Sequence, residues 1–125
     1  MKLQHIAFSV SNIDEVEKFY ADILEMKKLK SFVLKKELAH KIFNINEDTA
    51  VFLMGKEELT FEIFVSNQKV EKGFAHICIS VKDREKLIEK VEAQKYECIR
   101  IERDNFDLIF IKDKNGNIFE IKEIR

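Results

Sequence analysis

Two histidines and two glutamates occupy matching places in a sequence that repeats itself once. The repeat shows in HIAFSV at residues 5–10 and HICISV at residues 76–81. A second match joins TFEI at residues 60–63 with IFEI at residues 118–121. Neutral imidazole nitrogens and carboxylate oxygens are good ligands for divalent zinc, nickel, cobalt, manganese or iron. The duplicated set therefore predicts a metal site with positions left for water or substrate oxygens. Its predicted ligands are His5, Glu62, His76 and Glu120.

The placement of these side chains follows from the two-residue period of a β-strand, in which successive side chains point to opposite faces. On the first strand of each half, His5 shares a face with Ala7, and His76 shares a face with Cys78. The opposite faces are strongly apolar and must pack under helices. The faces that carry histidine and glutamate are therefore expected to line a concave sheet surface.

Each first strand runs almost directly into a helix start. In the first half, Asn12 can cap the helix, with Glu15 three residues on as the reciprocal partner of a capping box. In the second half, Asp83 can take the capping position. Apolar residues then recur at helical spacing in both halves. The predicted buried stripes are Val16, Phe19, Tyr20, Ile23 and Leu24 in the first helix, and Leu87, Ile88 and Val91 in the second.

After each helix come segments rich in isoleucine, valine, phenylalanine and leucine, which are typical of strands. The segment DKNG at residues 113–116 predicts a hairpin turn, because asparagine and glycine tolerate positive φ. The sequence therefore predicts an α+β fold of two modules, each with a strand, a helix and about three strands (βαβββ). The strands expected after the helices are Leu29–Lys36, Leu38–Asn44, Thr49–Met54 and Leu59–Val65, then Cys98–Arg103, Asp107–Lys112 and Ile118–Ile124.

Length and composition bound the class of protein. The chain has 125 residues and a mass of 14.8 kDa, so we expect a single domain over residues 1–125 with the repeat at residues 1–66 and 73–125. The 22 Lys and Arg residues balance 23 Asp and Glu residues, which argues against a dedicated nucleic-acid binder. We find no apolar run near the roughly 18 residues of a membrane span and no secretory signal. We therefore expect a cytoplasmic protein with Cys78 and Cys98 as reduced thiols.

The other reactive side chains have no counterpart in the repeat. His40 stands in a different context and is interpreted as a surface or substrate-side residue, not a ligand. Cys78 shares the His76 face, where a small buried residue is the expected description, and no motif surrounds Cys98. A basic cluster is more typical of an edge strand protected by lysines than of an anion clamp, for which Arg100 and Arg103 are alternatives. The cluster comprises Lys27, Lys28, Lys30, Lys35 and Lys36.

Four segments carry a resemblance that covers essentially the whole chain. They are KLQHIAFSVSNIDEVEKFYADILEM at the start, then LTFEIFV, GFAHICISV and DKNGNIFEIKE. With them the chain resembles the vicinal oxygen chelate superfamily (the glyoxalase/bleomycin resistance/dioxygenase family), and within it the small bacterial glyoxalase I proteins. Glu25 stands where the family often has glycine, which questions the turn after the first helix.

The resemblance implies paired βαβββ modules that close a metal-binding cup, with His5, Glu62, His76 and Glu120 as ligands of a divalent ion (nickel, zinc, cobalt, manganese or iron). It also implies a homodimer, with the site built within one chain or shared between two. Pairing of open module edges gives a physical reason for such an assembly.

In glyoxalase I, the substrate is the hemithioacetal of a 2-oxoaldehyde with glutathione. A ligand carboxylate takes the proton from C1, an enediolate forms, and the metal neutralises its charge. The proton returns at C2 and gives a 2-hydroxyacyl thioester. The resemblance thus implies a metal-dependent lyase of the lactoylglutathione lyase type, acting on a small-molecule glutathione or CoA thiol conjugate. Glu62 and Glu120 are both candidates for the base, since a carboxylate moved off the metal is a stronger base than a bound one.

Four alternatives are weighed against glyoxalase I. Metal-dependent antibiotic-modifying transferases of the superfamily are one, but the sequence shows no clear sign of their potassium or phosphonate site. Methylmalonyl-CoA epimerases follow the same proton-abstraction logic but often have glutamine where Glu62 stands. Extradiol dioxygenases need His, His and Glu around iron, and a fourth ligand such as Glu62 disfavours that chemistry. A drug-binding protein of the bleomycin-resistance type is not an enzyme and generally lacks the ligand set. Metal analysis of the purified protein separates this last class from the enzymes.

Overall fold

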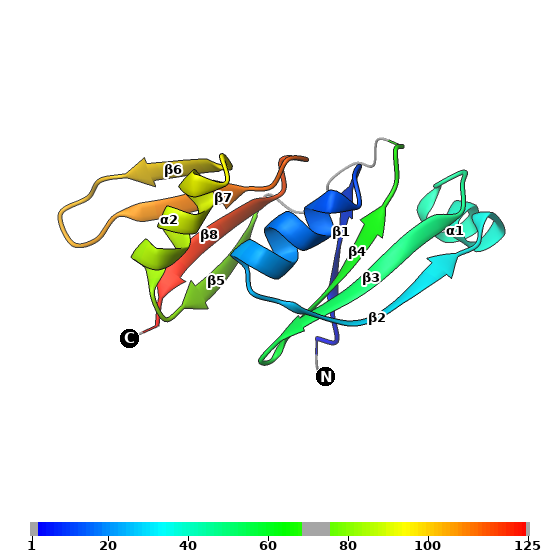
Figure 1. The fold of residues 1–125 in the computed structure, drawn as a ribbon, viewed down its shortest axis with the longest axis horizontal. Coiled ribbons are helices and arrows are strands. Elements are labelled where there is room, and N and C mark those ends of the chain that lie inside the picture. The colour runs from blue at the N-terminus through cyan, green and yellow to red at the C-terminus, as the bar shows by residue number, and fades with distance from the viewer. Residues whose placement is uncertain (1–2, 69–75, 125) are drawn as a thin grey trace. The chain divides into compact units, whose positions relative to one another are not determined.

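The computed structural model describes residues 3–68 and 76–124 and divides the chain into two compact units, residues 1–71 and 72–125. Each unit holds one four-stranded mixed sheet (Figure 1). The predicted α+β fold of two βαβββ modules is confirmed, with one additional helix in the first unit. Within the described residues, the structure contains no helix that is both long and apolar enough to cross a membrane.

The first unit is built from β1 (Ile6–Val10), the π-helix η1 (Val16–Ile23), β2 (Lys27–Leu34), α1 (Lys36–Phe43), β3 (Thr49–Lys56) and β4 (Leu59–Val65). Its strand order is β1-β4-β3-β2. Strand β1 pairs with β4 in parallel, and the other two pairs are antiparallel. Strand β2 therefore forms one edge of the sheet, as the lysines in it predicted.

The second unit repeats this topology with β5 (Ile77–Val81), α2 (Arg84–Ala93), β6 (Glu97–Ile101), β7 (Leu108–Lys112) and β8 (Ile118–Glu123). Its strand order is β5-β8-β7-β6, again with a parallel pair, β5 and β8, at one edge. In both units the chain thus enters at an edge strand and finishes on the strand beside it, so the first and last strands of each half lie next to each other.

The main core of each unit lies between η1 or α2 and one face of its sheet, and in the first unit a smaller buried cluster lies under α1. In the first unit, the rings of Phe8 and Phe61 meet edge to face with centroids 5.0 Å apart, and Tyr20 of η1 packs 6.1 Å from Phe8. In the second unit, α2 contacts β6 and β8, and Phe119 and Ile121 are buried. Both predicted apolar stripes are confirmed, because every residue assigned to them is buried.

The cap predicted at Asp83 and the turn predicted at residues 113–116 are confirmed. The predicted capping box of Asn12 and Glu15 is not formed as expected, because Glu15 is itself the N-cap residue of η1 and makes no side-chain cap hydrogen bond. The side-chain oxygen of Asn12 accepts the amide of Asp14 at 2.9 Å, and Asp83 accepts the amide of Lys86 at 3.0 Å at the start of α2. In the β7–β8 turn, Asp113 accepts the amides of Asn115 and Asn117, while Gly116 has φ 80°. Short polar side chains thus satisfy backbone donors that have no partner within a helix or hairpin.

The strand predicted at Leu38–Asn44 is wrong, because this segment lies in and just after helix α1. Ala39 is fully buried, and the Phe43 ring meets Phe64 of β4 with centroids 4.9 Å apart. Asn44 ends the helix in the left-handed conformation with φ 59°, which asparagine tolerates. The short apolar run fits both the helix period and the strand period. Burial of Ala39 and the ring contact of Phe43 with Phe64, on the same helical face, decide in favour of the helix.

The turn after η1 forms with Glu25 at the position where the resemblance implies glycine. Glu25 adopts φ 56°, a conformation that favours glycine. Lys56 of β3 holds the turn, since its ammonium group lies 3.1 Å from the Glu25 carboxylate and donates to the Leu24 carbonyl at 3.3 Å. A cross-strand cation therefore stabilises the turn that glycine would otherwise favour.

Candidate metal centre

The first unit brings His5 and Glu62 together. His5 lies immediately before β1, and Glu62 lies in the middle of β4, opposite Ala7 in the parallel register. The Nε2 atom of His5 is 3.2 Å from a carboxylate oxygen of Glu62. The imidazole is 44% exposed and the carboxylate side chain 18% exposed, so the pair is open to solvent on the histidine side.

The second unit repeats the pair with His76 and Glu120. His76 precedes β5, and Glu120 of β8 lies opposite Cys78. The Nε2 atom of His76 is 3.4 Å from a carboxylate oxygen of Glu120, and the exposures are 43% and 17%. The match with the first unit in distance and burial follows from the shared register, since the parallel first and last strands place the two side chains on one face.

The distance between the two side-chain atoms of each pair is compatible with two ligands of one ion. Donors at about 2.1 Å from an ion lie roughly 3.0 Å apart in an octahedron and roughly 3.4 Å apart in a tetrahedron. Each unit supplies one nitrogen and one oxygen in this spacing. Among the described residues, no three His, Cys, Asp or Glu side chains cluster as a metal site. Each pair supplies one nitrogen and one oxygen of the predicted four-ligand set, and these donor types fit a divalent ion.

Cys78 is exposed, which corrects the expectation of a small buried residue. Its thiol shares a hydrogen bond with Glu120, and partial burial together with this carboxylate raises the pKa of the thiol. The residue is exposed because it lies on the His76 face, away from α2. In the first unit Ala7 takes the same place beside Glu62, so the thiol is specific to the second pair.

Phe110 also belongs to the surroundings of the second pair, although nothing in the sequence singled it out. Its ring meets the His76 imidazole edge to face, with centroids 5.8 Å apart. It lies opposite Glu120 in the antiparallel register of β7 and β8. The sequence predicted a strand at Asp107–Lys112, whose alternation puts Phe110 on one face. Placing Phe110 beside Glu120 also requires the register between β7 and β8, which the sequence does not give.

The remaining candidates lie elsewhere. His40 is exposed on α1, in agreement with a surface position. Cys98 is half-buried, and burial raises the pKa of its thiol. Both cysteines are free in the structure.

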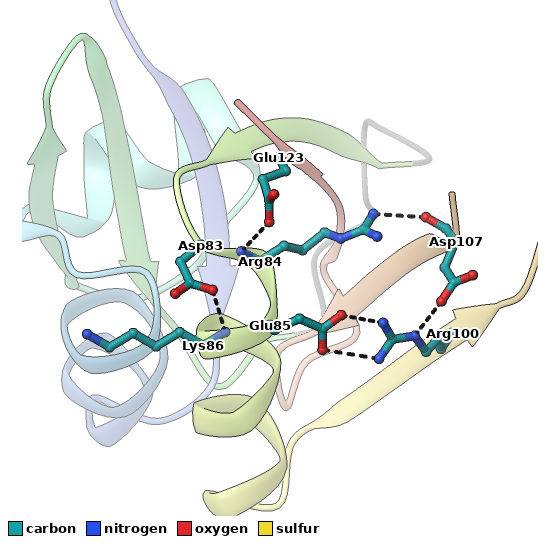
Figure 2. Close-up of polar contacts among 7 residues, drawn as sticks. All are labelled: Asp83, Arg84, Glu85, Lys86, Arg100, Asp107 and Glu123. Carbon is teal, nitrogen blue, oxygen red and sulfur yellow. Dashed lines mark hydrogen bonds and ion pairs between the residues drawn. The ribbon is translucent and has the colours of Figure 1, made fainter. Parts of the chain in front are cut away.

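Arg100 is engaged on the helix side of the second sheet. Figure 2 shows its guanidinium between Glu85 of α2 and Asp107, with the Asp107 oxygen 2.7 Å from Nε. The guanidinium lowers the pKa of both carboxyl groups. Arg84 continues the network, since its Nη1 donates to the Asp107 carbonyl at 2.8 Å. Arg103 instead stacks on Phe106, 5.3 Å from the ring centroid. Arg100 and Arg103, the two arginines considered as anion clamps, are therefore both engaged with groups of their own unit.

Comparison with known proteins agrees with this architecture. A family model described as the Glyoxalase/Bleomycin resistance protein/Dioxygenase superfamily matches residues 2–121. The chain is 28% identical over 122 residues to a lactoylglutathione lyase of Arabidopsis thaliana, covering 94% of this chain and 42% of that protein. The chain thus spans about two-fifths of the length of this curated relative.

Two solved structures show the same fold at low identity. Glyoxalase I of Leishmania major, described as trypanothione-dependent, superposes with a TM-score of 0.72 at 18% identity, covering 98% of this chain and 86% of that one. The fosfomycin resistance protein of Listeria monocytogenes, in complex with Mn(II) and a dihydroxypropylphosphonic acid, gives 0.75 at 17% identity and covers 97% and 90%. The fold is therefore shared by proteins with different substrates.

Proposed function

The chain belongs to the Glyoxalase/Bleomycin resistance protein/Dioxygenase superfamily, and we propose that it is a metal-dependent lyase of the glyoxalase I type. It would convert the hemithioacetal of a 2-oxoaldehyde and a thiol such as glutathione to a 2-hydroxyacyl thioester. The observation that carries the proposal is the duplicated His–Glu pair, with Nε2–carboxylate distances of 3.2 and 3.4 Å. A drug-binding protein without a metal would have no use for two such pairs.

We propose His5, Glu62, His76 and Glu120 as the ligands of a divalent ion. When bound, the ion supplies positive charge where oxyanions develop on the substrate. The histidines bring neutral nitrogen donors, which keep that positive charge uncancelled, whereas each glutamate brings a negative oxygen. Four protein ligands leave two positions of an octahedral site for the two vicinal oxygens of the substrate. We also expect these ligands to be assembled in a homodimer, from one chain or from two.

The proton transfer falls to one of the two glutamates. Its carboxylate takes the proton from C1 of the hemithioacetal and returns it at C2, so that no outside reductant or oxidant is needed. Both carboxylates are only partly exposed, which limits exchange of the transferred proton with water. The Nε2 atom of the paired imidazole lies within 3.4 Å of each carboxylate, so the histidine and the glutamate of one pair can both reach a single ion.

The decisive experiment measures turnover of the methylglyoxal–glutathione hemithioacetal by absorbance of the thioester. The protein is stripped of metal and reloaded separately with nickel, cobalt, manganese and zinc. Thioester formation that depends on the added ion supports the proposal and identifies the useful metal. Absence of product with every ion, in protein whose melting temperature rises on metal addition, rejects this substrate and leaves the metal site. Proton exchange on methylmalonyl-CoA is then the next assay, because an epimerase uses the same carboxylates.

A further inference from the structure

Strand β2 contains a β-bulge at Leu29. Lys28 pairs with Met54 of β3, whereas Lys30 pairs with Leu53, the very next residue, so one extra residue is inserted on β2. Regular alternation would put Lys28 and Lys30 on the same face. A one-residue shift of register reverses this, and bulges are known to re-aim side chains in this way. The two lysines therefore point to opposite faces of the first sheet.

The contacts of the two lysines agree with this reversal. The ammonium group of Lys28 lies 5.7 Å from the ring of Phe52, which pairs with Ile63 on the face covered by η1. The ammonium group of Lys30 lies 6.0 Å from the ring of Phe32, which pairs with Val51 on the other face. The bulge thus separates two neighbouring cations of one edge strand.

Lys30 shares its face with Glu62. Lys30 pairs with Leu53, and Leu53 pairs with Glu62, so the three residues form one row across β2, β3 and β4. Two strand spacings put their backbones about 10 Å apart. Lys35 and Lys56 are neutralised by Asp48 and Glu25. Lys30 is exposed and its ammonium group lies over the Phe32 ring, so its charge faces solvent on the side of the candidate base.

The glycine in β3 accommodates the bulge. A Cβ atom added at Gly55 would lie 2.8 Å from Cδ1 of Leu29, so the Leu29 side chain occupies the space above this glycine. Gly55 pairs with Thr60, two residues from Glu62 on the same face of the sheet. Leu29 and Phe32 are 58% and 42% exposed. Beside the cation, this face therefore offers exposed apolar side chains.

We propose that Lys30 is a specificity-determining residue that binds a carboxylate on the thiol part of the substrate. The inference rests on the proposed function. A lysine is a point charge on a flexible stem, and a small peptide thiol carries its carboxylates several bonds from the sulfur, in keeping with a row about 10 Å long. Leu29 and Phe32 contact the aliphatic part of the same thiol. Lys27, which pairs with Gly55 on this face, adds to the positive potential.

Lys28 offers a matched control, because Lys28→Gln removes the same charge from the same strand on the opposite face. The probe is S-methylglutathione, which cannot turn over, and its neutral-carboxyl counterpart is the dimethyl ester. Calorimetric titration of metal-loaded protein is expected to show about two- to fivefold weaker binding of S-methylglutathione in Lys30→Gln. Binding of the diester is expected to be unchanged, and the loss should shrink as salt screens the charge.

The outcomes separate this inference from the proposed function. Three outcomes overturn the role of Lys30. The wild type and Lys30→Gln bind S-methylglutathione with equal affinity, Lys30→Gln and Lys28→Gln lose the same amount of affinity, or the wild type does not bind S-methylglutathione. Turnover of the hemithioacetal then still supports the lyase, with the thiol held by other groups. Conversely, a selective loss of binding in Lys30→Gln without turnover of any hemithioacetal supports the anion subsite and rejects the lyase. Where turnover occurs, Lys30→Gln should raise KM and leave kcat unchanged.

Discussion

The rows of side chains that cross the two sheets at Glu62 and Glu120 differ outside the shared His–Glu pairs. They run Lys30, Leu53, Glu62 and Ala7 in the first unit, and Ile99, Phe110, Glu120 and Cys78 in the second. The first row has a cation at its edge, and the second has an aromatic ring and a thiol beside its glutamate. Duplication has therefore kept the donors of the pair while the neighbouring positions diverged.

The rows next to the glutamates differ as well. Two residues after Glu62, Phe64 is buried under α1. Two residues after Glu120, Lys122 is exposed, and the described part of the second unit has no helix between β6 and β7. The first half thus covers one end of its glutamate-bearing face with apolar packing, and the second half leaves the equivalent position to a charged side chain. Equivalent substitutions in the two halves should therefore have different effects on turnover and on stability.

The largest expected effect comes from neutralising the glutamates. Glu62→Gln and Glu120→Gln remove a negative ligand and a candidate base, and loss of a general base alone costs roughly 10²- to 10⁴-fold in rate. We expect turnover to fall at least about 100-fold in each variant, with the larger loss marking the base. Initial rates under saturating metal and circular dichroism measure activity and fold.

Glu89→Gln, on the exposed side of α2, controls for the charge change and should leave turnover intact. Normal turnover in Glu120→Gln would remove this residue from the list of essential groups. Equal losses of turnover in Glu62→Gln and Glu120→Gln would mean that the different neighbours of the two glutamates do not give them different roles.

The next largest effect is structural and confined to the first half. Phe64→Ala removes the ring that packs on Phe43 beneath α1, and truncation of a buried phenylalanine typically costs about 3–5 kcal/mol. We expect the free energy of unfolding in urea to fall by that amount. Leu38→Ala, at a side chain 52% exposed on the same helix, serves as the control. Similar losses in both variants would contradict the docking of α1 through Phe64.

The histidines test whether the two halves contribute equally to metal binding. His5→Ala and His76→Ala each remove one nitrogen donor, and we expect metal affinity to fall at least about tenfold in each. His40→Ala changes the third histidine, which lies exposed on α1, and should bind metal as the wild type does. Equilibrium dialysis followed by metal analysis gives the stoichiometry. A full complement of tightly held metal in both His5→Ala and His76→Ala would exclude the proposed site.

The smallest effect concerns the acid dependence of the second half. Arg100 lowers the pKa of Glu85 and Asp107. Stability from a lowered carboxyl pKa is present above the unfolded value and is lost as pH falls through the folded value. Arg100→Gln should therefore be less stable than wild type near about pH 7, and the difference should shrink near about pH 2. Urea unfolding at both pH values measures this, with Arg103→Gln as the control. A difference that is constant with pH would attribute the effect of Arg100 to packing.

The sequence alone determined most of the local structure and which histidine and glutamate occupy matching places in the two halves. The repeated HIAFSV and HICISV segments, the apolar stripes at helical spacing and the capping residue Asp83 act over a few residues, so their meaning does not depend on distant parts of the chain. Even so, the run at Leu38–Asn44 was assigned as a strand, because a short apolar segment fits two periods. Only its burial against Phe64 makes it a helix.

Tertiary structure decided which side chains meet across strands. The contact of each histidine with its glutamate needs the parallel register of the first and last strands, which no local signal encodes. The bulge at Leu29 is a second example, since alternation read from sequence puts Lys28 and Lys30 on one face. Accommodation of Leu29 above Gly55, 26 residues later in the chain, reverses the face of Lys30. A register is set by contacts between distant residues, and one residue of shift changes every face that follows.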